Sequence, residues 1–333
     1  MKGENKKMKK IGICTLYFAN NFGAILQAFA LQETLINMGH EVEFIKLKEF
    51  NLNPNHINIE KFNQSKKHLN IAKHLYNNEL DSYDAIIIGS DEMWNLTNGS
   101  FEHLDEYFGY NFNCDKIISY APSGNGTSPT FFTEFYANKN INFDTFTNIS
   151  VRDLKTKELV NIISGRNAEL VLDPTLLIEN FEKYAKFPNE NFKDYIIVYG
   201  YNFNDDEINK ITSFAKKHNK KIYSIGFQKD WCDTLTADIF EFLGYIKNAD
   251  YVITNTFHGT LFSLILEKEF AIFSKSNNKV EDIMERLQFQ DRDAMQVNDL
   301  DKIFEQKVDY EKINTLKSKY REISLNYLKN NLK

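Results

Sequence analysis

The sequence contains few cysteines, and their spacing gives them no evident joint role. Cys14, Cys114 and Cys232 are odd in number, lie far apart and form no CxxC motif. Neither a disulfide framework nor a zinc knuckle is therefore indicated, and buried free thiols are expected. HExxH is also absent, so we predict no metal site.

The chain also lacks a dense basic block and a long apolar run. Its 40 Lys and Arg residues are outnumbered by 46 Asp and Glu residues, for a formal net charge of -6, which disfavours nucleic-acid binding. The opening MKGENKKMKK is basic, but the apolar stretch after it is soon interrupted by Tyr17 and Asn20. That stretch is too short for a signal peptide or a membrane span. We therefore expect a cytoplasmic protein without a transmembrane segment.

Nucleotide-binding motifs are missing as well. There is no GxxxxGK[ST], and PSGNGTS at 122–128 lacks the third glycine of a dinucleotide fingerprint. The usual phosphate-loop and dinucleotide interpretations are therefore weak.

What the chain does have is an alternation of short apolar runs and helical patterns. Its 333 residues and 42% hydrophobic content are enough for two domains. The pattern predicts a helix at 23–38 and strands at 10–16, 41–47, 83–90, 116–121 and 148–153. Strands that alternate with helices are typical of a parallel α/β sheet.

A second series of predicted strands follows at 194–201, 220–227, 250–256 and 269–274. The polar segment 182–194 is a plausible connector, so we predict an N-terminal Rossmann-like domain at 1–180 and a C-terminal one at 181–333. The tail from Tyr310 is predicted to be one long amphipathic helix that closes the fold. Residues 51–80 are rich in Asn, Lys and His, and they are predicted to be a surface insertion that could be partly helical, whose three histidines are mostly solvated and have no role.

Three stretches lie where predicted strands end, which is where doubly wound folds bind ligands. In the first, TLYFANNFGAILQ at 15–27, the residues Asn20, Asn21 and Gly23 predict a tight turn into a helix. The free NH groups of such a turn can face an anion, and the Asn pair and Gln27 add side-chain donors. The alternative is that Gly and Asn are simply good turn formers.

The second stretch, GSDEMWN at 89–95, directly follows a predicted buried strand. Asp91 could act as a base or orient a hydroxyl group, and Trp94 could offer a flat face to a sugar ring. Alternatively, Ser90 and Asp91 cap a helix and Trp94 packs in the core. The sequence leaves both interpretations open.

The third stretch, TNTFHGT at 254–260, places His258 at a predicted helix start. Thr256, Gly259 and Thr260 lie beside it, and Asn255 precedes them. A phosphate is readily accommodated at such a helix terminus. The alternative is a histidine that only packs.

The motifs NNFGAILQ, YDAIIIGSDEMWN, ISYAPSGNG, NISVRD, LVLDPTLL and ADYVITNTFHGTLFSLI occur in this order. Together they resemble the polysaccharide pyruvyl transferase family over roughly residues 10–290. The resemblance implies two Rossmann-like domains facing across a cleft, as in GT-B glycosyltransferases. It also implies transfer of a pyruvyl group from phosphoenolpyruvate to hydroxyls of a cell-surface sugar, as in bacterial exopolysaccharide or capsule synthesis. The products would be a ketal and phosphate.

The resemblance also implies roles for individual residues. The arginine of the family's SVR motif falls on Arg152, and its phosphoenolpyruvate-contacting histidine falls on His258. We expect Arg152 to hold the donor's anionic groups, His258 to act as the acid or phosphate ligand, and Asp91 as the hydroxyl-side base. Replacing Arg152 is expected to weaken donor binding and leave the fold intact. The predicted donor and acceptor ligands are Arg152, Asn20, Asn21, Gly23, Gln27, Ser90, Trp94, Asn255, Thr256, Gly259 and Thr260.

The chain departs from the family pattern at one place. Some relatives carry an arginine two residues before the histidine, where this chain has Thr256. Arg166 or Lys275 could compensate, although a surface charge is the simpler interpretation of each. No cofactor is expected beyond the donor itself, and the acceptor would be a glycan or lipid-linked sugar, with peripheral membrane association left open. Two rival functions remain, a nucleotide-sugar glycosyltransferase on the same fold and a catalytically degenerate sugar-binding protein.

Overall fold

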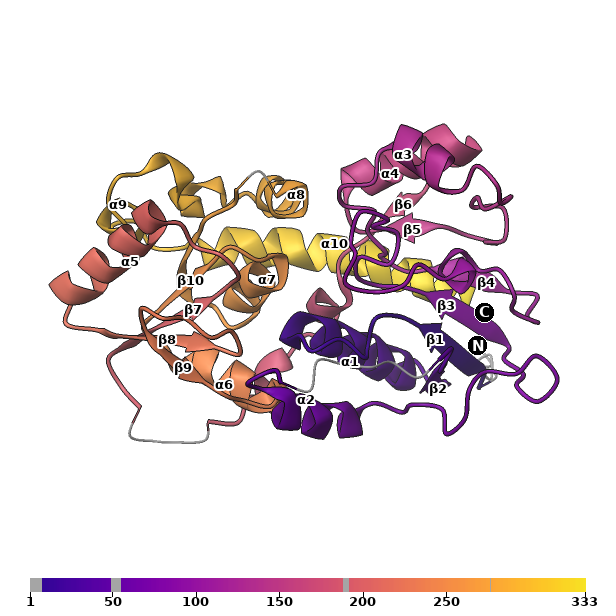
Figure 1. Ribbon diagram of the computed structural model, residues 1–333, viewed down its shortest axis with the longest axis horizontal. Helices are drawn as coiled ribbons and strands as arrows, with labels where there is room; N and C mark the ends of the chain where they lie inside the picture. Colours follow the sequence, from indigo (N-terminus) through magenta and orange to yellow (C-terminus); the bar gives the residue numbers. More distant parts are fainter. Residues whose placement is uncertain (1–7, 49–54, 188–191, 276) are drawn as a thin grey trace, which may run out of the picture.

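The computed structural model describes residues 8–48, 55–187, 192–275 and 277–333. Residues 1–7 of the basic opening, 51–54 of the predicted insertion and 188–191 of the predicted connector lie outside these ranges. The described chain forms two α/β halves that lie side by side (Figure 1).

The first half is built on a parallel sheet with the strand order β2-β1-β3-β4. Its central strand β3 has the sequence AIII, and each of these residues is 0% exposed. A continuous apolar run of this kind suits a strand covered on both faces. The elements of this half are β1 (Lys10–Cys14), α1 (Phe22–Asn37), β2 (Glu41–Phe44), α2 (Ile59–Ser65), β3 (Ala85–Ile88), β4 (Ile117–Ser119), α3 (Pro129–Phe135), β5 (Ser150–Val151), α4 (Leu154–Ser164) and β6 (Glu169–Leu170).

The second half contains a parallel sheet with the order β11-β10-β7-β8-β9. The predicted α/β fold with two Rossmann-like units is therefore confirmed, while the division near residue 180 stays a prediction. The elements are β7 (Tyr195–Tyr199), α5 (Asp205–Lys217), β8 (Lys221–Ile225), β9 (Asp233–Leu235), α6 (Ile239–Asn248), β10 (Tyr251–Thr254), α7 (Phe257–Ile265), β11 (Glu269–Ile272), α8 (Asn278–Leu287), α9 (Asp301–Phe304) and α10 (Tyr310–Asn331).

The long C-terminal helix α10 was correctly predicted, and it joins the two halves. In Figure 1 it runs from the second half into the first. Tyr327 donates its hydroxyl hydrogen bond to the carbonyl of Ser119 at the end of β4, at 2.9 Å, and Ser324 accepts one from the Leu172 amide at 2.8 Å. The helix thus closes the fold by returning to the first sheet.

The segment around α2 lies mostly at the surface, as the sequence predicted, but a few of its side chains are buried. Asn58, Phe62 and Ser65 are each at most 1% exposed. Asn58 donates to the Ala237 carbonyl at 2.9 Å and accepts from the Ala237 amide at 2.8 Å, and Lys61 pairs with Glu241 at 2.8 Å. The segment therefore braces the first half against α6 of the second.

The three histidines of this segment, for which the sequence predicted no functional role, differ in their contacts. His68 packs its ring 4.6 Å from the Phe240 ring, and His56 packs 5.3 Å from Phe62. His68 and His74 are both exposed, His74 with 58% of its side chain accessible. The sequence of this segment shows only a weak apolar periodicity, because the brace depends on one buried amide and a few ring contacts and not on an apolar helix face.

We predict that Asn58→Ala lowers the free energy of unfolding by about 1–3 kcal/mol, because it leaves the buried amide and carbonyl of Ala237 without a partner. Urea unfolding of the variant and of Asn209→Ala, an exposed position on α5, measures the difference. An unchanged unfolding midpoint for Asn58→Ala would show that the brace contributes nothing.

The prediction that the cysteines are buried free thiols is confirmed in part. All three cysteines are unpaired, and Cys14 is fully buried, while Cys114 and Cys232 are partly exposed. Burial raises the pKa of the Cys14 thiol far above its ordinary value, so this thiol packs as a small apolar group.

Candidate active site

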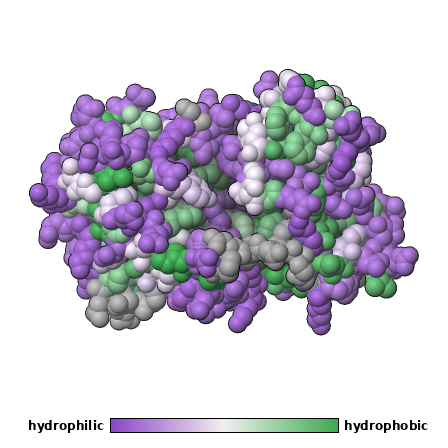
Figure 2. Space-filling view, in the orientation of Figure 1, coloured by the Kyte–Doolittle hydropathy of each residue, from purple (hydrophilic) through white to green (hydrophobic). Residues whose placement is uncertain are grey.

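A cavity of about 660 Å³ opens between the two halves, where Figure 2 shows a recess near the middle of the molecule. Its wall includes residues just beyond the carboxyl ends of strands from both sheets: Leu16 after β1, Asp91 after β3, Tyr201 after β7 and Asn255 after β10. Parallel sheets place their ligands at this edge, and the cavity is therefore the candidate active site.

Three helices begin at this cavity. Asn21 accepts the hydrogen bond of the Ala24 amide and so caps α1, and Thr256 caps α7 by accepting from the Gly259 amide. Asn277 precedes α8, and all three residues line the cavity. Because each helix N-terminus carries a partial positive charge, their convergence favours a strongly anionic ligand.

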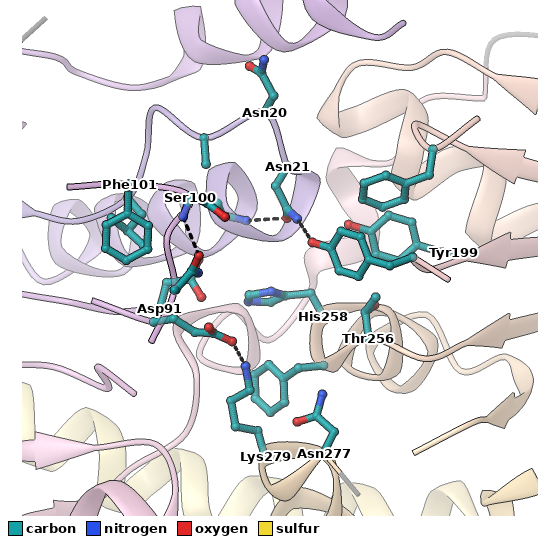
Figure 3. Close-up of a pocket in the computed structure, with 18 of the residues that line it drawn as sticks. Asn20, Asn21, Asp91, Ser100, Phe101, Tyr199, Thr256, His258, Asn277 and Lys279 are labelled. Carbon is teal, nitrogen blue, oxygen red and sulfur yellow. Dashed lines mark hydrogen bonds and ion pairs between the residues drawn. The ribbon is translucent and has the colours of Figure 1, made fainter. Parts of the chain in front are cut away.

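His258 lies on the first turn of α7, and in Figure 3 its ring points into the cavity toward Asp91. Its Nε2 atom is 3.5 Å from the Oδ2 atom of Asp173, a carboxylate that is fully buried. The opposite side of the ring packs on Gly23, where an added Cβ would lie 2.2 Å from Nδ1. Gly23 is therefore required for the position of the histidine.

Asp173 organises the cationic side of the site. Its Oδ2 atom accepts from Arg152 at 2.9 Å, and its Oδ1 atom accepts from the amide and hydroxyl of Thr175 at 3.0 and 2.8 Å. Burial raises the pKa of the Asp173 carboxyl, but His258 and Arg152 together lower it well below its usual range. The carboxylate is therefore ionised across the physiological range, and it holds the Arg152 guanidinium and the His258 ring in place.

Arg152 is 3% exposed and bridges two carboxylates. One guanidinium nitrogen donates to Asp173, and the other donates to Asp91 at 3.1 Å. Its guanidinium carbon lies 4.6 Å from the centre of the Phe257 ring, and this cation–π contact also stabilises the guanidinium. Arg152 is thus part of the wall of the cavity and of the buried framework beneath it.

A second ion pair, between Glu92 and Lys279, crosses the cavity between the two halves. Lys279 is on the first turn of α8 and is 6% exposed, and Figure 3 shows its side chain rising into the cavity. Burial raises the pKa of the Glu92 carboxyl, but the Lys279 ammonium lowers it more, to about 2. Lys279 is therefore a second cation at the site, which the sequence interpretation missed.

The structure separates the predicted site residues into two groups. Those that line the cavity are Asn20, Asn21, Asp91, Arg152, Asn255, Thr256 and His258. Those that do not line it are Gly23, Gln27, Ser90, Trp94, Gly259 and Thr260. Of the second group, Gln27 donates to Thr15 at 3.1 Å, and Thr260 donates to the Thr256 carbonyl at 3.0 Å, so both support the wall from behind.

Trp94 is the clearest correction. It is 0% exposed, donates its indole NH to the Tyr107 carbonyl at 2.8 Å and stacks on Phe108 with ring centres 5.9 Å apart. The interpretation of Trp94 as a platform for a sugar is therefore wrong, and its alternative, core packing, is correct.

Neither residue considered as compensation for the missing arginine reaches the cavity. Arg166 donates to the carbonyls of Phe143 and Phe146, both at 2.7 Å, and so fixes a loop. Lys275 pairs with Glu207 at 2.8 Å. Within the described ranges, no group of three or more His, Cys, Asp and Glu residues is arranged to hold a metal ion. None of the described helices is both long and apolar enough to cross a bilayer.

Comparison with known proteins gives one family and one fold. The model of a family described as polysaccharide pyruvyl transferase matches residues 21–277, and no curated protein matches the sequence significantly. A putative UDP-N-acetylglucosamine 2-epimerase from Listeria monocytogenes has a similar structure, with a TM-score of 0.53 and 9% identity over 95% of this chain and 90% of that chain. The glycotransferase of kitacinnamycin is similar too, with a TM-score of 0.53 and 9% identity over 98% of this chain and 100% of its own.

A third similar structure is an alpha-glucosyltransferase in complex with UDP-glucose and DNA containing an abasic site. Its TM-score is 0.50, with 11% identity over 97% of this chain and 95% of that chain. At these identities the likeness shows the fold alone, and it is the GT-B-like arrangement of two Rossmann-like units that the sequence predicted.

Proposed function

Because the chain belongs to the polysaccharide pyruvyl transferase family, we propose that it transfers the pyruvyl group of phosphoenolpyruvate to two hydroxyls of a sugar acceptor. The observation that supports this most strongly is the convergence of three helix N-termini, Arg152, Lys279 and His258 on one cavity. Phosphoenolpyruvate carries a phosphate and a carboxylate on a small carbon frame. A site for it must neutralise several negative charges in a small volume, and these groups do so.

The donor competes with two carboxylates for the same cations. Asp91 and Glu92 are neighbours in the loop after β3, and they pair with Arg152 and Lys279 respectively. When the donor's phosphate and carboxylate take these cations, Asp91 is released beside the acceptor. Binding of the donor to Arg152 and Lys279 is thereby coupled to the release of Asp91 as the base.

The reaction then needs one acid and one base. His258 delivers a proton to the methylene carbon of the donor, and the first sugar hydroxyl attacks the resulting cationic carbon while Asp91 accepts its proton. The bond from that carbon to the phosphate oxygen breaks, and the released phosphate remains in the cavity. The second hydroxyl attacks the same carbon and closes the ketal, and the phosphate takes its proton before it departs. The proton on Asp91 then restores the one that His258 gave to the methylene carbon.

Lys279 supplies the second donor cation that is missing at the position of Thr256. Some relatives place an arginine there, two residues before the histidine. In this chain the cation comes instead from α8, and its ammonium lies over the Phe257 ring, 5.9 Å from the ring centre. The absent arginine is therefore weak support for the rival view of a degenerate binding protein. We further propose that the acceptor is a glycan or lipid-linked sugar assembled in the cytoplasm.

The proposal is tested with the full chain by thermal unfolding and by calorimetry. Phosphoenolpyruvate is expected to raise the melting temperature, and uridine and guanosine diphosphates are expected to leave it unchanged. Lys279→Gln should weaken phosphoenolpyruvate binding by about 1.5–3 kcal/mol, the value of a hydrogen bond to a charged group. The control is Lys312→Gln, an exposed lysine on the first turn of α10.

Stabilisation by a nucleoside diphosphate instead of phosphoenolpyruvate would favour a nucleotide-sugar glycosyltransferase. Binding of phosphoenolpyruvate without phosphate release across a broad acceptor panel would favour the degenerate binding protein. Equal affinity of Lys279→Gln and Lys312→Gln for the donor would remove Lys279 from the site.

A further inference from the structure

The helix α8 presents a charged face to the contact between the two halves. Lys279, Asp282 and Arg286 are spaced at i, i+3 and i+7, so they lie on one side of the helix. At most 8% of each side chain is exposed, and in Figure 1 α8 lies at the side of the second half that faces β5 and β6. Burying charges costs free energy unless each charge is paired, so the partners of these residues indicate what the face does.

Arg286 joins this face to the small sheet of the first half. One terminal guanidinium nitrogen donates to the Arg152 carbonyl at 3.1 Å and to the Asp282 carboxylate at 3.3 Å, and the other lies 3.5 Å from the Val171 carbonyl oxygen. Arg152 directly follows β5 and Val171 directly follows β6, and these two strands pair in parallel. The planar fork of an arginine reaches two carbonyls in a fixed geometry. Arg286 therefore fixes α8 against the ends of both strands.

The guanidinium of Arg286 also contacts the C-terminal helix. Its central carbon lies 4.9 Å from the centre of the Tyr320 ring on α10, and this cation–π contact stabilises the buried charge. The side chain is thus held where α8, α10 and the ends of β5 and β6 meet.

The two cations that are proposed to bind the donor belong to different halves of the molecule. Arg152 follows β5 in the first half, and Lys279 is on the first turn of α8 in the second half. Along α8, Lys279 and Arg286 are separated by a rise of about 10 Å. Two turns of helix and one backbone contact therefore connect Lys279 to the main chain of Arg152.

Phosphoenolpyruvate places a strict requirement on the distance between these cations. Its carboxylate and its phosphate ester oxygen are attached to the same carbon, so the separation of its two anionic groups varies little. In the structure the cations also pair with Asp91 and Glu92, but the donor replaces those ion pairs when it binds. Arg286 contacts the carbonyl of Arg152 and not its guanidinium, so this contact is compatible with a bound donor.

We propose that Arg286 is a positioning residue for the donor: by fixing α8 to the ends of β5 and β6, it sets the distance between Lys279 and Arg152 that phosphoenolpyruvate requires. The proposal rests on the proposed pyruvyl transfer, because that function assigns both cations to the donor. Its consequence is selective. A ligand with two anionic groups depends on Arg286, whereas inorganic phosphate, with one, can bind to either cation.

The first test compares the two ligands by calorimetry on the full chain. In Arg286→Gln the affinity for phosphoenolpyruvate is expected to fall roughly tenfold or more, since a misplacement of about 1 Å can cost about a hundredfold. The affinity for inorganic phosphate should change little. The control is Arg321→Gln, whose partner Glu179 is exposed, and it should change neither affinity. Equal losses for both ligands, or an unchanged affinity for phosphoenolpyruvate, would overturn the proposal.

A second substitution covers the case in which Arg286→Gln does not fold. Arg286→Lys keeps a positive charge beside Asp282, but its ammonium cannot reach both carbonyls in the geometry of the guanidinium fork. The same selective loss of phosphoenolpyruvate affinity is expected, at a smaller size. Wild-type affinity for phosphoenolpyruvate in folded Arg286→Lys would show that the charge alone suffices and would overturn the positioning role.

The position of Lys279 can also be measured without a donor. In the wild type its ammonium is buried and paired with Glu92, so acetylation by an N-hydroxysuccinimide ester, followed by mass spectrometry, should be slow. Either substitution of Arg286 is expected to increase this acetylation severalfold. Lys61, which joins the halves through Glu241, should react as in the wild type. An unchanged rate at Lys279, or an equal increase at both lysines, would overturn the proposal.

The acetylation experiment separates this proposal from the proposed function. If Lys279 becomes reactive in the variants but the wild type does not bind phosphoenolpyruvate, Arg286 still positions Lys279 and pyruvyl transfer is rejected. If the wild type binds phosphoenolpyruvate but the reactivity of Lys279 does not depend on Arg286, the proposed function stands and the positioning role is rejected.

Discussion

His258→Gln is expected to lower phosphate release from phosphoenolpyruvate by about 10²-fold or more, the usual scale for loss of a general acid. The melting temperature should change little, because glutamine keeps a donor for Asp173 and fits beside Gly23. Asp173 also retains its bonds from Arg152 and Thr175. The measurement compares phosphate release, with an acceptor panel present, and thermal unfolding for both proteins.

A matched control is available on the surface. His74 faces Asp81 at 3.7 Å, close to the 3.5 Å between His258 and Asp173, but 58% of its side chain is exposed. His74→Gln should leave turnover unchanged. Near-normal turnover of His258→Gln would dismiss the acid role, and a loss of activity in proportion to a lowered melting temperature would favour the alternative in which His258 only packs.

The sequence was informative where one local pattern decides the structure. The run AIII in β3 is wholly buried, as a central parallel strand must be. The start of α7 places Thr256 as the cap and His258 on the first turn, so the position of the histidine followed from cap chemistry and a strand end. These features depend on neighbours within a few residues, and a single sequence contains them.

The sequence was uninformative where the structure depends on distant partners. Lys279 is part of an ordinary amphipathic helix, and its partner Glu92 lies 187 residues away. Asp173 belongs to LVLDPTLL, a motif that contributed to the family resemblance but to which no role was assigned. The neighbouring sequence does not indicate that Arg152 and His258 both face this carboxylate. The sequence allowed Trp94 to face either the solvent or the core, because the rings that pack on it come from distant positions such as Phe143 and Phe146.

Arg152→Ala is expected to abolish tight donor binding and also to destabilise the fold by about 3–5 kcal/mol, the usual effect of breaking a buried ion pair. This revises the expectation that the fold would be unaffected. Arg152 is 3% exposed, and its removal leaves the fully buried Asp173 without its guanidinium partner. The control is Arg321→Ala, whose partner Glu179 is 83% exposed, and such surface pairs contribute about 1 kcal/mol or less.

The double variant Arg152→Ala/Asp173→Asn distinguishes an unpaired charge from lost packing. Neutralising Asp173 removes the buried charge, so the double variant should be more stable than Arg152→Ala, although it should still fail to bind phosphoenolpyruvate tightly. The dependence on pH has the same origin. Because the folded pKa of Asp173 is depressed, its contribution to stability is present above the unfolded pKa of about 4 and is lost as the pH falls below it.

Urea unfolding at neutral and acidic pH, with calorimetric titration of the donor, measures both effects. The double variant should show a weaker loss of stability on acidification than the wild type, because it lacks the Asp173 carboxylate. If Arg152→Ala and Arg321→Ala had equal unfolding free energies, the buried bridge would carry no stability. If Arg152→Ala bound phosphoenolpyruvate as tightly as the wild type, Lys279 and the helix N-termini would suffice for the donor, and Arg152 would be a structural residue alone.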